Sequence, residues 1–159
     1  MKGISEAIAV RKKQQIDRTT LVSVLQKQYA TVPENKNVSA NIESLLQPNT
    51  FTICTAHQPN LLTGYMYFFY KILHAISLAE MLNKNFPNEH FVPVYYMGSE
   101  DNDLDELGQF RYDKKKYKWD ANGQKGAVGR MDTKSLKPLL DELFKRLGPP
   151  GIHLDELKK

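Results

Sequence analysis

The chain has 159 residues, of which 41% are hydrophobic and 25% are charged, and its formal charge is +4. This composition is typical of a soluble globular protein and predicts one domain, long enough to bury a core without disulfides or metals. Cys54 is the only cysteine, which excludes an internal disulfide and favours a reducing, cytoplasmic location. No apolar stretch approaches the ~20 residues of a transmembrane helix.

The N-terminal part, residues 1–49, is predicted to be helical. Apolar residues recur three or four apart over residues 4–29, which indicates an amphipathic helix with a break near residues 17–20. Residues 38–46 are predicted to form a short helix that ends at Pro48. We expect this segment to pack on an α/β core at residues 50–147, which a polar tail at 148–159 follows. Together these parts would make one domain, or part of one.

The central part predicts a strand, a helix and a second strand. Residues 51–55 are β-branched or aromatic, and residues 65–82 are apolar nearly all round, so a mostly buried helix with Thr63 as its N-cap is expected. The apolar run at 91–97 is typical of a strand buried on both faces. This order predicts a right-handed βαβ unit with parallel strands, and hence an α/β fold. Beyond it we expect a hairpin at 112–119, a strand at 128–131 and a helix at 134–147.

Polar residues follow each predicted strand at its carboxyl end, where open α/β sheets bind ligands. The first group suits an anion at a helix N-terminus, and comprises Thr55, His57, Gln58, Asn60, Thr63 and Gly64. The second group suits a ribose hydroxyl, an amine or a metal-bound phosphate, and comprises Glu100, Asp101 and Asp103. Lys71 lies seven residues after Gly64 and could lean toward the first group with an extended side chain.

Each of these residues also has a purely structural interpretation. His57 could be a general acid or base, or a loop histidine that caps an element. The acidic group could be a solvated turn, and Lys71 could be a surface lysine. Cys54 lies within a predicted strand with no adjoining base, which predicts a buried structural thiol. The sequence contains no GxGxxG, Walker or metal-ligand pattern.

Several strings resemble one family when they are read together with their spacing. They are Thr55-Ala56-His57-Gln58, Leu62-Thr63-Gly64 with Tyr67 and Lys71, residues 91–97 followed by 99–103, and the flanking Gln28-Tyr29 and residues 126–131. These residues resemble the cysteine-adding enzymes of bacillithiol biosynthesis, also called cysteine ligases. The resemblance covers the chain up to about Leu147.

The resemblance implies a Rossmann-like core and a ligase that joins L-cysteine to glucosaminyl-malate. It further implies ATP as the cofactor that activates the cysteine carboxylate, with Mg possible alongside the nucleotide. Under this interpretation His57, Gln58, Lys71, Asp101 and Asp103 would be catalytic. The residues that would bind the nucleotide are Thr55, Asn60, Thr63, Gly64 and Glu100.

The chain departs from the family's usual residues at three places. Ala56 stands where members have glycine, Tyr65-Met66 where they have Pro-Leu, and Asn102 where they have histidine. Family members are also much longer and continue into a C-terminal coiled coil that mediates dimerisation. We therefore expect a partial or truncated member, in which a homodimer would have to form without the coiled coil.

Two other functions stay open at this stage. The chain could be a catalytically inactive relative that keeps the crevice and binds a small molecule or a protein. It could also bind nucleic acid weakly through residues 114–119, where Lys114, Lys115, Lys116 and Lys118 alternate with Tyr117 and Trp119. The structural interpretation of the same lysines is a solvated strand edge protected against edge-to-edge pairing.

Overall fold

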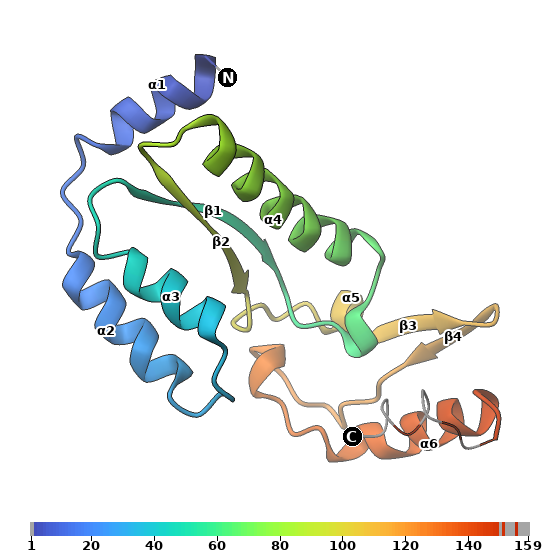
Figure 1. Ribbon diagram of the computed structural model, residues 1–159. Coiled ribbons are helices and arrows are strands. Elements are labelled where there is room, and N and C mark those ends of the chain that lie inside the picture. Colours follow the sequence, from blue (N-terminus) through green and yellow to red (C-terminus); the bar gives the residue numbers. More distant parts are fainter. Residues whose placement is uncertain (1, 150, 152–154, 156–159) are drawn as a thin grey trace. The chain divides into compact units, whose positions relative to one another are not determined.

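The computed structural model describes residues 2–149, 151 and 155 (Figure 1). The chain divides into two compact units. The first unit comprises Met1–Thr55 and Lys71–Tyr95, and the second comprises Ala56–Tyr70 and Tyr96–Lys159.

The first unit begins with three helices: α1 (Lys2–Arg11), α2 (Arg18–Tyr29) and α3 (Lys36–Ser44). The break expected near residue 17 is present. The side chain of Asp17 accepts a hydrogen bond from Thr20 N at 2.9 Å and so caps the N-terminus of α2. Asn35 begins α3 in the same way, since its Oδ1 accepts from Asn37 N at 3.0 Å.

Strands β1 (Thr50–His57) and β2 (His90–Met97) form a two-stranded sheet, and α4 (Tyr67–Asn85) connects them. The strands run in the same direction (Figure 1). His90 N, at the first residue of β2, donates to Asn49 O just before β1 at 3.0 Å, and Gly98 N just after β2 donates to His57 O at the end of β1 at 2.9 Å. The predicted βαβ order and parallel α/β fold are confirmed.

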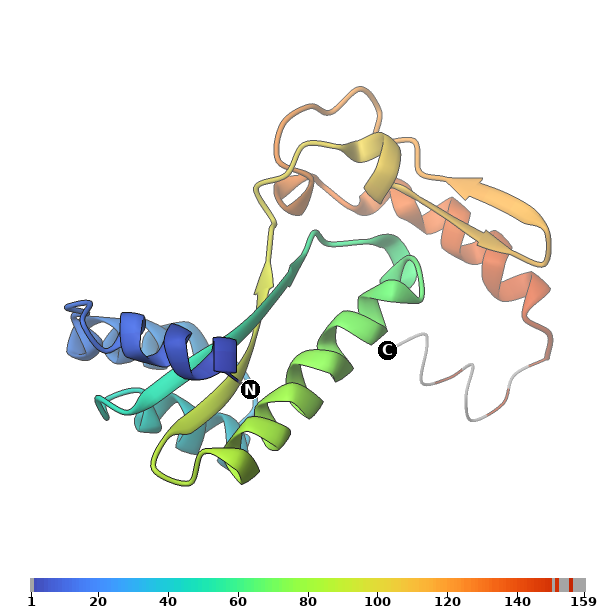
Figure 2. The ribbon, with the colours of Figure 1, turned by 90° about the horizontal axis from the view of Figure 1, so that it is seen from above.

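The core of the first unit lies on both faces of this sheet. On one face Phe91 packs with Leu82 and Ala79 of α4 and Ile8 of α1. On the other face Val92 packs with Val22 of α2, Ile42 of α3 and Leu45, which follows α3. Figures 1 and 2 accordingly show α4 on one side of the strands and α2 and α3 on the other. Alternate residues of β2 therefore serve two separate apolar clusters.

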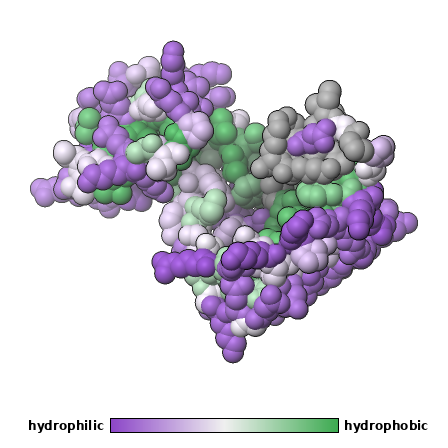
Figure 3. Space-filling view, turned by 90° about the horizontal axis from the view of Figure 1, so that it is seen from below, coloured by the Kyte–Doolittle hydropathy of each residue, from purple (hydrophilic) through white to green (hydrophobic). Residues whose placement is uncertain are grey.

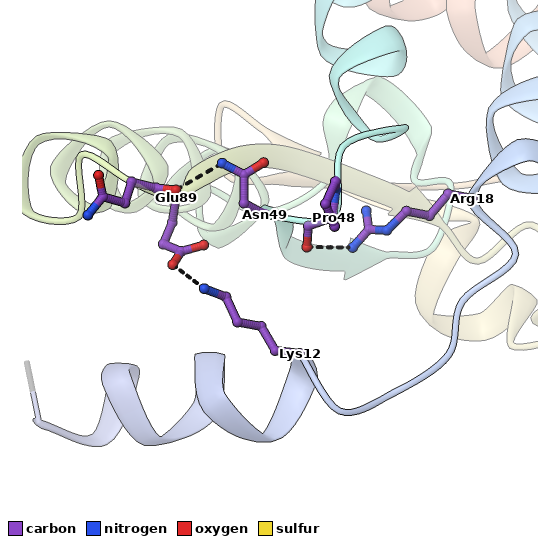
Figure 4. Close-up of polar contacts among 6 residues, drawn as sticks. Lys12, Arg18, Pro48, Asn49 and Glu89 are labelled. Atoms are coloured by element: carbon purple, nitrogen blue, oxygen red, sulfur yellow. Dashed lines mark hydrogen bonds and ion pairs between the residues drawn. The ribbon is translucent and has the colours of Figure 1, made fainter.

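Polar contacts fasten the N-terminal helices to the beginnings of the strands (Figure 4). Lys12 Nζ lies 2.5 Å from Glu89 Oε1, just before β2. Arg18 donates from Nη1 to Leu45 O at 2.8 Å and from Nη2 to Pro48 O at 3.4 Å. Asn49 Nδ2 donates to Asn88 O at 2.8 Å and so joins the two segments that precede the strands. Backbone carbonyls between α3 and β1 thus gain a charged donor, and the carbonyl of Asn88 before β2 gains an amide donor.

Burial is lower than the sequence predicted for α4 and Cys54. Only Ala75, Ala79 and Leu82 of α4 are buried, whereas Tyr70 is 67% exposed and Leu73 is 60% exposed. Cys54 is exposed, so the prediction of a buried thiol was wrong. Both errors have one cause. An apolar sequence predicted that other segments would cover these elements on every side, but among the described residues alternate side chains of β1 and much of α4 are exposed. Figure 3 shows apolar residues, in green, at the surface of one face of the molecule.

The second unit is built from short elements: η1 (Leu61–Thr63), α5 (Leu104–Leu107), β3 (Gln109–Tyr112), β4 (Lys115–Lys118), η2 (Val128–Arg130), η3 (Lys134–Leu136) and α6 (Lys137–Arg146). Strands β3 and β4 form the expected antiparallel hairpin, with Phe110 opposite Tyr117. These two rings stack at 4.9 Å. Trp119 is buried and donates from Nε1 to Ser135 Oγ at 2.7 Å. The hairpin and α6 region therefore has its own aromatic core.

Two local predictions in this unit were wrong. Residues 128–130 form a 3-10 helix instead of a strand, because the amides of Val128 and Gly129 bond to the loop after β2 and the amide of Arg130 bonds to Ala127 O. Thr63 does not cap α4, which begins at Tyr67, because Gly64 with φ 64° and ψ −132° turns the chain away after η1. The predicted tail lies largely outside the described residues. None of the described helices is long and apolar enough to cross a membrane.

Leu82 and Leu73 provide a matched pair for testing the core. Leu82 has no exposed surface, and Leu82→Ala is expected to lower the free energy of unfolding by about 2–5 kcal/mol through lost burial and a cavity. Leu73→Ala on the same helix is expected to change it by less than about 0.5 kcal/mol, because Leu73 is largely exposed. Urea unfolding followed by circular dichroism measures both, and equal effects would contradict this packing.

Candidate functional site

The two loops that follow β1 and β2 lie side by side within the second unit. The backbone bond from Gly98 N to His57 O, 2.9 Å long, holds their first residues together. One residue further on, Gln58 Nε2 donates to Asp101 Oδ2 at 3.0 Å. A side chain from each predicted polar group therefore takes part in one hydrogen bond. The sequence predicted this juxtaposition, since the carboxyl ends of neighbouring parallel strands meet at one edge of a sheet.

His57 is held rigidly at the end of β1. Its side chain is only 6% exposed, and its ring lies 5.0 Å from the ring of Tyr67 and 5.7 Å from that of Phe68. Its Nδ1 atom is 3.0 Å from Gln58 O and 2.9 Å from Asn60 Nδ2. These contacts come from the loop and from the first turn of α4. They fix the ring plane, which a group that orients a ligand or transfers a proton requires.

Asp101 accepts hydrogen bonds on both carboxylate oxygens. Oδ2 accepts from Gln58 Nε2, and Oδ1 accepts from Asp103 N at 3.0 Å. These bonds, the one from Gln58 first, favour the charged form and lower the pKa of Asp101 below its ordinary value of 3.8. Asp101 is thus a negatively charged acceptor at neutral pH, already oriented before any ligand arrives.

The other two acids of the second group have different partners. Glu100 Oε1 accepts from the Tyr96 hydroxyl at 3.0 Å, and this bond together with the carboxylate charge raises the pKa of Tyr96. Asp103 Oδ1 accepts from Glu106 N at 3.1 Å and so caps α5. Asp103 therefore has a structural task in this unit, whereas Glu100 and Asp101 lie directly after β2.

Thr55 and Lys71 belong to the first unit, and their predicted roles stay predictions. Thr55 is half-buried in β1, and Lys71 is exposed on α4. The side chain of Thr63 lies outside what the structure describes. Gly64 does require glycine, because a Cβ there would lie 2.8 Å from Asn60 Cβ and φ is positive. Ala56, by contrast, lies in β1 without a positive φ, so its methyl group causes no backbone strain there.

A third segment contacts the acidic loop, and the sequence analysis did not place it there. Val128 N donates to Asp101 O at 2.8 Å, and Gly129 N donates to Ser99 O at 3.2 Å. A Cβ at Gly129 would lie only 2.7 Å from Ser99 Cβ, so the close approach needs glycine. The sequence predicted a strand at 128–131 without a partner for it, and Gly129 is a residue type that allows such a close approach. Residues 128–129 hold the backbone of the acidic loop.

The donors and acceptors of this site suit a small polar ligand. Carboxylates of Glu100 and Asp101 can accept from hydroxyl or amine groups, while amides from the first loop can donate to an anion. Among the described residues, no group of three or more His, Cys, Asp or Glu side chains is placed to hold a metal ion. The nucleic-acid alternative is not favoured, because Tyr117 and Trp119 are buried, and Lys115 and Lys118 pair with Glu142 and Asp105.

Gln58→Ala is predicted to raise the pKa of Asp101 toward 3.8, since the largest contribution to its lowering is lost. A lowered pKa stabilises the fold above the ordinary value, and this stabilisation disappears as the pH falls through the lowered one. The pH-dependent difference in stability between wild type and variant should therefore be full near neutrality and vanish in acid. Titration of the carboxyl carbons by NMR measures the pKa directly.

Asp105 is the internal control for that titration. Its pKa is lowered by Lys118, through a 2.8 Å ion pair that Gln58 does not touch. It should stay low in Gln58→Ala and rise in Lys118→Met. An Asp101 pKa that is the same in wild type and Gln58→Ala would show that the two loops are not joined by this bond.

Comparison with known proteins agrees with the geometry. A family model described as "Bacillithiol biosynthesis BshC, N-terminal Rossmann-like domain" matches residues 2–158. Proteins named "Putative cysteine ligase BshC" from Flavobacterium johnsoniae and Cytophaga hutchinsonii are each 42% identical over 143 residues, or 90% of this chain. One from Flavobacterium psychrophilum is 45% identical over 119 residues, or 75% of the chain.

These relatives are much longer than the chain. The matched parts are 27% of the Flavobacterium johnsoniae and Cytophaga hutchinsonii proteins and 22% of the Flavobacterium psychrophilum protein. The expectation of a partial member agrees with this coverage. The match to the family model nevertheless extends over nearly the whole chain, including every element of both units described above. The chain therefore belongs to the BshC family, and it corresponds to the N-terminal Rossmann-like domain of that family.

Proposed function

We propose that the chain contributes the ligand-binding α/β core to the ligation of L-cysteine to glucosaminyl-malate in bacillithiol biosynthesis. The family description names bacillithiol biosynthesis, and the names of the relatives describe a cysteine ligase. The structural observation that most supports the proposal is the Gln58–Asp101 hydrogen bond, which joins the two strand-end loops into one polar site. Open α/β sheets bind their ligands at this position.

We further propose that ATP is the cofactor. Formation of an amide from a carboxylate requires activation, and bound ATP would supply that activation. The residues fit a nucleotide in kind, because Asp101 and Glu100 can accept hydrogen bonds from ribose hydroxyls. The first turn of α4, a helix of 19 residues, favours a phosphate. A Mg ion would take most of its ligands from the phosphates and water.

Within this proposal the chain's own residues bind and orient. Gln58 holds Asp101 ionised, so that the carboxylate attracts a hydroxyl or an ammonium group. His57 is fixed between Asn60 and the rings of Tyr67 and Phe68, so its imidazole would orient a ligand group in a defined direction. Asp103 supports the site from the start of α5 instead of touching the ligand.

Asp101→Asn is predicted to weaken ATP binding by about tenfold or more, because a charged acceptor is lost. The matched control is Asp105→Asn, the same substitution on α5, where the carboxylate pairs with Lys118. Its affinity should equal that of wild type. Isothermal titration of the folded chain measures all three proteins. Equal affinities for wild type and Asp101→Asn, or no saturable binding of ATP to wild type, would contradict this proposal.

A second assay separates ligation from binding alone. The chain is incubated with ATP, L-cysteine and glucosaminyl-malate, and the mixture is analysed by mass spectrometry for the amide product. Product that is absent in Asp101→Asn would support a ligase site in this chain. ATP binding without product would instead support a relative that binds the ligands of the reaction and depends on the rest of the longer protein, or one that has lost turnover.

A further inference from the structure

A second cleft lies in the second unit, away from the Gln58–Asp101 bond. It has a volume of about 410 Å³, and its walls come from β3, the end of α6 and the loop around Gly64. This volume falls within the range of small-molecule sites. Most of the lining is apolar, and includes Leu62, Tyr65, Phe110, Tyr112, Phe144 and Leu147. No acidic residue lines it among the residues described.

One end of this cleft is cationic. Arg111 lines the cleft and also a smaller adjoining pocket of about 60 Å³, to which Lys116 contributes. Tyr65, Gln109 and Phe110 line both as well, so the two hollows lie next to each other. An apolar chamber that ends at two cationic side chains is complementary to a ligand with an apolar body and an anionic group.

The pairing of the hairpin strands makes these two charges unusual. Arg111 and Lys116 are register partners on β3 and β4, directly opposite each other. Like charges in that arrangement repel and destabilise a hairpin. For neither of them does the structure record an ion pair with a described residue. Asp105 attracts Lys116 electrostatically but forms its ion pair with Lys118, so among the described residues no ion pair offsets the repulsion.

The other cations of this region each form an ion pair with an acid. Lys118 pairs with Asp105, and Arg146 pairs with Asp113, at 2.8 and 2.9 Å. Lys115 pairs with Glu142 on α6. These pairs leave Arg111 at the cleft and Lys116 at the adjoining pocket as cations with no ion pair among the described residues. An anion bound there would relieve their repulsion and gain two charged donors.

We propose that this cleft binds a small molecule that combines an apolar or aromatic body with a carboxylate or phosphate group. The body lies against the rings of Phe110, Tyr112 and Phe144, and the anion lies at Arg111 and Lys116. The site is distinct in its residues from the Gln58–Asp101 site, apart from sharing the Gly64 loop. It does not depend on the proposed ligase function.

The test uses two fluorescent probes of similar shape and different charge. Anilinonaphthalene sulfonate is anionic, and N-phenylnaphthylamine is neutral. The double substitution Arg111→Gln with Lys116→Gln should weaken binding of the anionic probe by about tenfold and leave the neutral probe unchanged. The control, Lys114→Gln with Lys125→Gln, removes the same two charges from positions outside the cleft and should change neither. Phe144→Ala should weaken both probes.

Three results would overturn the proposal. The first is unchanged binding of the anionic probe in the Arg111 and Lys116 double variant. The second is a loss of anionic-probe binding in the control double variant as large as that in the Arg111 and Lys116 double variant. The third is a loss of neutral-probe binding in the Arg111 and Lys116 double variant as large as the loss of anionic-probe binding. Displacement of the anionic probe from wild type then identifies the anion. Benzoate competing better than phenyl phosphate indicates a carboxylate ligand, and the reverse order indicates a phosphate ligand. Failure of both to compete would also reject the site.

Discussion

The hydrogen bond from Gly98 N to His57 O is the contact on which the candidate site depends. It closes the parallel ladder of β1 and β2 at the carboxyl end, so the loops that follow must begin next to each other. Gln58 and Asp101 lie soon after these two residues in the sequence, so Gln58 Nε2 and Asp101 Oδ2 come within 3.0 Å of each other. The site is thus a direct consequence of parallel pairing, which in turn requires a crossover such as α4 between the strands.

Around this contact the chain uses side chains mainly to hold the backbone and each other in place. Asp103 begins α5, Asn60 contacts His57, and the amides of Val128 and Gly129 bond to carbonyls of Ser99 and Asp101. Glycine is needed at 129 because the segment touches Ser99 so closely. A ligand would therefore meet donors and acceptors that are already ordered, which reduces the entropy lost on binding. The cationic cleft at Arg111 and Lys116 is a separate feature of the same unit.

The order of elements was predictable from the sequence, and so was the approach of the two polar groups, because both depend on local patterns. Turn residues after 55 and 97 indicated where the strands end, although β1 continues to His57, and strand, helix, strand order brought the two polar groups together. Features that depend on distant contacts were not predictable. The segment 128–130 looks like a strand by residue type but bonds to the loop after β2. Cys54 and the outer face of α4 looked buried, yet burial depends on covering segments that residue patterns alone cannot supply.

Amide hydrogen exchange of the chain with and without ATP tests most directly whether the two loops make one ligand site. The loops at residues 57–64 and 98–103 come from different parts of the sequence and are joined by only a few bonds. The account predicts that saturating ATP slows exchange in both loops together, with no comparable slowing at the loop between α2 and α3. Slowing in one loop only, or at residues 109–112 and 143–147 instead, would contradict it.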